Sequence, residues 1–166
     1  NQTRISYPWL VYFLPFIGLL IGYLFYYYGT PIEKGTHLLI DEIHHPRAFI
    51  PKRMTPLVFF TAILTQIFGG SAGREAPAVQ LSGALTDHIT QAFRVPGDNR
   101  KIFLIASIGS GFAAIFGLPL AGAIYGLEIT ALGKLRYSAV FPCFVSALVA
   151  SQIPELFHIS HPHQYY

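Results

Sequence analysis

The stretch Gly69-Gly70-Ser71-Ala72-Gly73-Arg74-Glu75-Ala76-Pro77 decides the fold of this chain, because it places two charges between apolar segments. Residues 54–73 include no charged residue, and a second apolar segment follows the stretch. Its glycines loosen the end of one helix, and its proline suits the first turn of the next, where a missing N–H is no loss. A helix that begins inside a membrane presents free N–H groups and the positive end of its dipole there. The stretch therefore predicts a site for an anion.

The composition is that of a membrane protein. Hydrophobic residues make up 52% of the chain and charged residues 11%, with a mean hydropathy of +0.46, whereas soluble domains carry about 25% charged residues. The net charge is +3, but the basic residues are scattered, which argues against nucleic-acid binding. The single Cys143 excludes an internal disulfide and a cysteine-based metal finger. Because the chain opens with Asn1, we expect it to be an incomplete piece of a longer protein.

The apolar segments predict an all-α, polytopic membrane fold with broken and re-entrant helices, forming one incomplete transmembrane domain over residues 1–166. The expected spans are about 7–28, 56–70, 77–93, 102–117, 119–132 and 137–153. The first is uncharged from Tyr7 to Tyr28, which at about 1.5 Å per residue crosses a hydrocarbon core of about 30 Å. Asp87, His88 and Gln91 are expected to mark the end of one span.

The uncharged run from Ile102 to Leu127 is too long for one span, and Pro119 breaks its hydrogen-bond ladder. We therefore expect two shorter helices that meet inside the membrane, with Glu128 on the second as a further intramembrane charge. Broken helices are tolerated where protein or a water-filled cavity satisfies their freed backbone groups, and they mark binding sites of transporters and channels. Gly122 is expected to be a packing residue.

Two other interpretations were weighed against transport. Residues 109–114 match the Gly-x-Gly-x-x-Ala dinucleotide fingerprint, but Pro119 would interrupt the helix that must carry the pyrophosphate. The chain is therefore not expected to be an enzyme or to hold a cofactor. The possible metal ligands Asp41, Glu42, His44 and His45 lie on or directly after a short predicted helix, roughly Thr36 to His44, and Asp41 and His45 stand one turn apart. A solvated polar cap that includes Glu42 explains them better, as it does His158, His161 and His163, so no metal site is expected.

Gly73-Arg74-Glu75-Ala76-Pro77 resembles the Gly-Arg/Lys-Glu-Gly-Pro signature of the CLC family of chloride channels and anion/proton exchangers, with Ala76 in place of the second glycine. Residues 111–122, followed by Glu128, are similar to the family's segment in which a Pro-Leu-Ala-Gly turn opens a helix that ends in carboxylates. The resemblance covers nearly the whole chain, but only the first half of a family member. It implies a homodimer with one pore per subunit, embedded in the lipid bilayer of a bacterial inner membrane.

The resemblance also implies roles for individual residues. Glu75 matches the gating glutamate, whose carboxylate occupies the outer anion site when ionised and swings away when protonated. The implied anion-binding positions are Thr36, Gly73, Arg74, Ala76, Phe116, Gly117 and Leu118. Two of these positions have an alternative. Arg74 is better explained as a structural residue that caps carbonyls or balances charge, and the Thr36 hydroxyl is explained equally well as a cap of the helix after it. Glu128 is expected to be a structural carboxylate that bonds to neighbouring helix ends.

Departures from the family pattern point to one branch of it. Gly35-Thr36-His37-Leu38-Leu39 stands where the family has Gly-Ser-Gly-Ile-Pro, which is similar to the branch that exchanges fluoride for protons. Ile129 occupies the place of the inner proton-transfer glutamate, so the inner proton path of chloride exchangers is not expected. The resemblance thus implies transport of chloride or fluoride, coupled to protons through Glu75. The alternatives are a passive voltage-gated chloride channel, or a structural membrane subunit in which Arg74 and Glu75 merely tie helices together.

Overall fold

The structure, a computed structural model, describes residues 8–30, 32–44, 49–70, 72–130 and 136–157. Most of these residues are helical and none of them is in a strand, which confirms the all-α prediction. In chain order the elements are η1 (Pro8–Phe13), α2 (Leu14–Tyr28), η2 (Ile32–Lys34), α3 (Thr36–His44), α4 (Met54–Ile67), α5 (Glu75–Ala92), α6 (Gly97–Phe116), α7 (Pro119–Thr130) and α8 (Tyr137–Leu156). The short helix expected between Thr36 and His44 is therefore present as α3.

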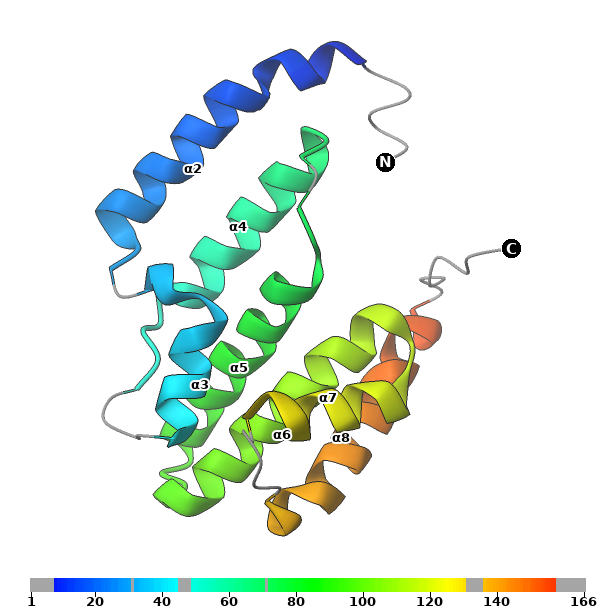
Figure 1. Ribbon diagram of the computed structural model, residues 1–166. Coiled ribbons are helices and arrows are strands. Elements are labelled where there is room, and N and C mark those ends of the chain that lie inside the picture. Colours follow the sequence, from blue (N-terminus) through cyan, green and yellow to red (C-terminus); the bar gives the residue numbers. More distant parts are fainter. Residues whose placement is uncertain (1–7, 31, 45–48, 71, 131–135, 158–166) are drawn as a thin grey trace.

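Helix α6 is the centre of the packing. It contacts α5, α7 and α8, while α4 packs on α5 and α2 packs on α4. Figure 1 shows the result, with α2 and α4 side by side at one edge and α6, α7 and α8 grouped at the other. The side chains of Leu104, Ile105 and Ile108 on α6 are almost wholly buried. The hydrophobic core therefore lies around α6.

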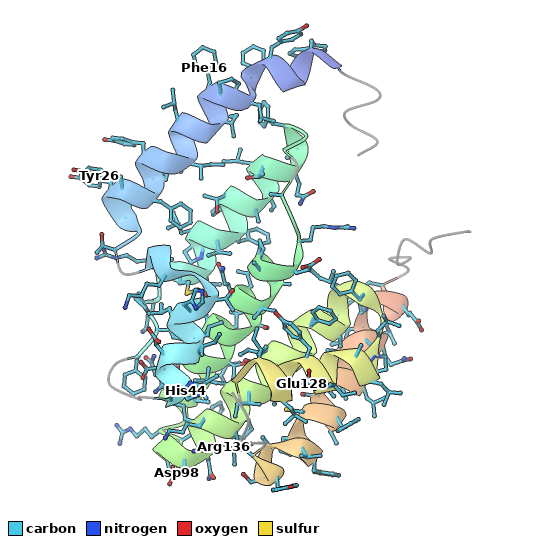
Figure 2. All side chains as sticks on the ribbon, in the orientation of Figure 1. Phe16, Tyr26, His44, Asp98, Glu128 and Arg136 are labelled. Carbon is cyan, nitrogen blue, oxygen red and sulfur yellow. The ribbon has the colours of Figure 1, made fainter. Side chains whose placement is uncertain are left out.

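Helix α2 has no buried residue. Phe16 and Tyr26 on its outer side are 69% and 84% exposed and point away from the other helices (Figure 2). Apolar surface of this extent is expected where the surrounding medium is hydrocarbon rather than water.

The structure divides the first expected span into two elements. A 3-10 helix over Pro8–Phe13 precedes α2, which begins at Leu14 and carries Pro15 in its first turn. Tyr7 lies outside the described residues. Within the described ranges, α8 is the helix that is long and apolar enough to cross a membrane by length and composition, while α2 and α4 are shorter apolar helices.

The predicted interruption at Pro119 is confirmed. Helix α6 ends at Phe116, and Gly117 follows in the left-handed conformation with φ +67° and its N–H bonded to the Ala113 carbonyl at 2.8 Å. That conformation favours glycine, and proline at the first position of α7 loses no intrahelical bond. The turn lets α7 fold back along α6 at close range. A Cβ added to Gly122 would lie 2.6 Å from the Gly109 carbonyl oxygen, so Gly122 is a packing residue as predicted.

Candidate functional site

Helix α5 begins at Glu75, directly after a segment that leaves α4 through Gly69, whose φ is +74°. Figure 1 shows this segment running back alongside α4, so that α5 starts well away from the end of α4. Gln66 on α4 ties the segment down, because its Nε2 donates to the Ala72 carbonyl at 3.2 Å. The Glu75 carboxylate consequently sits in the first turn of a helix, where the positive end of the dipole favours an anion. Arg74 and Glu75 are both exposed in this chain.

Aromatic side chains connect Glu75 with the turn between α6 and α7. Tyr125 of α7 lies close enough to the Glu75 carboxylate for an electrostatic interaction. The Tyr125 ring stacks on Phe112 with 4.5 Å between ring centroids, and Phe112 lies 4.5 Å from the Phe116 ring by the same measure. Ring contacts thus link Phe116 through Phe112 to Tyr125, and Tyr125 interacts electrostatically with Glu75.

Helix α3 brings Thr36 to α5. Gly35, with φ +56°, precedes α3, and Thr36 is its first residue. Nε2 of Gln80 donates to Thr36 Oγ1 at 3.4 Å. Gln80 lies five residues after Glu75 on α5, about 7.5 Å along the helix axis. The beginning of α3 thus lies against the first turns of α5.

A cavity of about 520 Å³ opens between α2, α4 and α5, and its lining is mostly apolar. Gly73, Arg74 and Gln80 are on its border, together with Thr61 and Thr65 of α4. A concave, mostly apolar site with a few polar groups is typical of small-ligand binding. The cavity therefore reaches the residues that precede Glu75.

The remaining predicted residues are placed as follows. Ala76 is in the first turn of α5, and Gly117 and Leu118 make the turn into α7. Glu128 lies three residues beyond Tyr125 on α7, where Figure 2 labels it. It is exposed, and within the described part of the chain no hydrogen bond or ion pair joins it to the other predicted residues.

Arg100, Asp87 and Glu42 form a buried ionic cluster that was not predicted from the sequence. Nε of Arg100 lies 2.6 Å from Asp87 Oδ1, and Nη1 of Arg100 lies 2.9 Å from Glu42 Oε1. Asp87 is wholly buried, and its Oδ2 accepts the Ile50 N–H at 2.7 Å. The cluster joins α3, α5, α6 and the segment before α4. Burial acts to lower the pKa of Arg100, but the hydrogen bonds to Asp87 and Glu42 outweigh it and raise that pKa.

One expectation is corrected by this cluster. Glu42 is not part of a solvated cap, since it is only 8% exposed, whereas Asp87 lies near the end of α5 as expected but is wholly buried. The burial of Glu42 could have been predicted from its spacing to Leu39 and Ile43. Positions i, i+3 and i+4 lie on one helix face, and all three of these residues are buried. The Asp41 side chain is exposed, and its Oδ2 lies 3.8 Å from Nζ of Lys34.

No group of three potential metal ligands is found among the residues that the structure describes. His45, His158, His161 and His163 lie outside them.

Comparisons with known proteins bear on the whole arrangement. Residues 17–165 match the family described as "Voltage gated chloride channel". The chain is 44% identical over 163 residues to a "Chloride/fluoride channel protein" of Pseudomonas syringae pv. tomato, covering 98% of this chain and 36% of that protein. It is 32% identical over 139 residues to an H+/Cl− exchange transporter of Vibrio parahaemolyticus, covering 79% of this chain and 29% of that protein.

The fold is similar to a solved structure described as a CLC-type fluoride/proton antiporter. The TM-score is 0.84 at 30% sequence identity, over 98% of this chain and 42% of the crystallised chain. The chain thus spans well under half the length of these relatives.

Proposed function

This chain belongs to the voltage-gated chloride channel family, also called the CLC family, and we propose that it is part of a transporter that exchanges chloride or fluoride for protons. The observation that carries the proposal is the position of Glu75 as the first residue of α5. Its carboxylate is held at the positive end of a helix, beside Tyr125 of α7 and next to residues that border the cavity. A site of this kind favours an anion.

The mechanism follows from the chemistry of a carboxylate. An ionised carboxylate is itself an anion, so Glu75 and the transported anion compete for the same positive environment. Protonation removes the charge of Glu75, and with it the attraction that holds the side chain there. Each cycle of binding and release at this position then couples a proton to the anion.

The anion-binding positions proposed with Glu75 are Thr36, Gly73, Arg74, Ala76, Phe116, Gly117 and Leu118. They supply a hydroxyl and the backbone around the starts of α3, α5 and α7, which are the kinds of donor that a dehydrated anion accepts. Fluoride is proposed as a transported ion because two relatives carry fluoride in their descriptions. The transporter is further proposed to be a homodimer in the lipid bilayer of a bacterial inner membrane, and Glu128 to have a structural role.

The second candidate is a passive channel. It is favoured by the description of the Pseudomonas relative as a channel protein. In that case Glu75 opens and closes the pathway, and no proton accompanies the anion.

The test is flux from proteoliposomes that contain the full-length protein, with proton and anion movement recorded together. Glu75→Gln keeps the size of the side chain but cannot ionise, so we expect proton movement to be lost while anion movement continues. Glu155→Gln, on the exposed end of α8, is the matched control and is expected to retain both. Anion flux without protons in the unaltered protein identifies the channel. Absence of any flux contradicts transport and leaves the structural subunit.

A further inference from the structure

Gln80 is the polar side chain that connects Thr36 with the cavity. It lies in the second turn of α5, is partly buried, and borders the same cavity as Gly73 and Arg74. Its Nε2 is 3.4 Å from Thr36 Oγ1. One amide group therefore stands between the hydroxyl at the start of α3 and the residues that precede Glu75.

The direction of this hydrogen bond decides what the Thr36 hydroxyl can do. A threonine hydroxyl has one proton to donate and two lone pairs that accept. Because the Gln80 amide donates to Oγ1, it occupies a lone pair and leaves the hydroxyl proton for another acceptor. If the amide oxygen faced Thr36 instead, that proton would be consumed by Gln80.

Packing between α3 and α5 holds the amide in place. A Cβ added at Gly35 would lie 2.9 Å from Gln80 Nε2, so the absence of a side chain there gives the amide room. One turn further along, a Cβ added at Gly83 would lie 2.5 Å from a methyl carbon of Leu39. Two glycines thus allow α3 and α5 to approach closely on either side of the Thr36–Gln80 contact.

We propose that Gln80 is a positioning residue that aims the Thr36 hydroxyl proton at the transported anion and thereby raises the affinity of the site. The proposal rests on the proposed function, since it assumes that an anion binds beside Thr36. Gln80 acts through Thr36 in this account and does not itself contact the anion.

A double-mutant cycle on the purified full-length protein tests the coupling, with fluoride and chloride binding measured by calorimetry. Loss of a hydrogen bond to a charged partner weakens binding by about tenfold or more, so we expect this loss for Gln80→Leu and for Thr36→Val. The double variant is expected to be no weaker than either single one, because both changes remove the same bond. Gln152→Leu, which removes an amide from an exposed position of α8, serves as the control and is expected to bind like the unaltered protein.

A second variant separates orientation from loss of packing. Gln80→Glu has nearly the same shape but presents only acceptors, so the Thr36 proton turns toward residue 80 and away from the anion. We expect binding to fall by at least as much as in Gln80→Leu. If Gln80→Leu does not give a monodisperse protein, the cycle is run with Gln80→Glu instead. If Gln80→Glu weakens anion binding as much in the Thr36→Val background as in the unaltered protein, the loss reflects charge repulsion. That outcome overturns the proposal.

The outcomes distinguish the two proposals. Unaltered protein that binds neither anion overturns the proposed function and this inference together. If the unaltered protein binds an anion, and Gln80→Leu and Gln80→Glu bind it as tightly as the unaltered protein does, only the role of Gln80 is overturned. Additive losses in the double variant overturn it as well.

Discussion

Arg100 is the residue on which several elements converge. Its two carboxylate partners, Asp87 and Glu42, come from α5 and α3, and its guanidinium lies 4.8 Å from the centre of the Phe49 ring. Charges that are taken out of water need partners with good geometry, and removing one partner leaves the other uncompensated. The raised pKa of Arg100 means that its stabilising contribution is fully present below the pKa of the unfolded state. It is lost only when the pH rises through the folded-state pKa, so Arg100 stays charged at every physiological pH.

We therefore expect Asp87→Asn to destabilise the protein by about 3–5 kcal/mol, because it leaves the buried guanidinium without its shorter ion pair. The measurement is reversible unfolding of the full-length protein in detergent. Asp41→Asn is the control, since Asp41 and Lys34 form an exposed pair at 3.8 Å that contributes little. Equal stability of the two variants would contradict a structural role for the Arg100 cluster.

At the scale of the helix, the positions of prolines and charges explain how well the helix starts could be predicted. Pro119 was expected to begin a helix and does so, whereas α5 was expected from Pro77 and starts at Glu75. Proline is tolerated throughout the first turn, so it marks the neighbourhood of a start and not the starting residue. Helix α6 begins at Gly97 rather than near Ile102, because the charged residues before Ile102 belong to the helix and include the buried Arg100.

Only part of the candidate site could be predicted from local sequence patterns. Glu75 and the turn at Gly117 follow from local patterns, since a charge between apolar segments and a Gly-x-Pro break are visible in the sequence. The contact of Thr36 with Gln80 and the position of Tyr125 beside Glu75 join residues that are far apart in the chain. Such contacts depend on how helices pack, for which the sequence alone offers no local signal.

The crossing of α6 and α7 yields a prediction for Gly122. A methyl group there would lie 2.6 Å from the Gly109 carbonyl oxygen and 2.7 Å from the Ala113 Cβ, and neither atom belongs to a flexible side-chain end. We expect Gly122→Ala to force the helices apart and to cost about 1–3 kcal/mol in unfolding experiments. Gly18→Ala on α2, where nothing lies within 4 Å, is the matched control and should be neutral or slightly stabilising. A similar loss for both variants, or no loss for Gly122→Ala, would contradict the close crossing of α6 and α7 as the cause, because alanine is the better helix former.

The whole molecule is an all-α, polytopic integral membrane protein of the CLC family. Its burial pattern fits that setting, because large apolar side chains such as Phe60, Phe141 and Leu148 are exposed while α6 is enclosed. Glu75 is exposed in a chain that spans 36% of its Pseudomonas relative and 42% of the crystallised antiporter.

Selectivity between anions is a property of the whole pathway. It depends on the free energy needed to remove water from the ion and on the free energy of the interactions that replace that water. Fluoride is smaller than chloride and more strongly hydrated, so it depends more on direct hydrogen-bond donors. We expect the full-length protein to release fluoride from proteoliposomes faster than chloride under equal gradients, as recorded with ion-selective electrodes. Thr36→Val should reduce fluoride release by about tenfold, the equivalent of one hydrogen bond to a charged group, and chloride release by less. Equal effects on both ions would mean that Thr36 acts on helix position and not on the ion, since a displaced helix slows both alike.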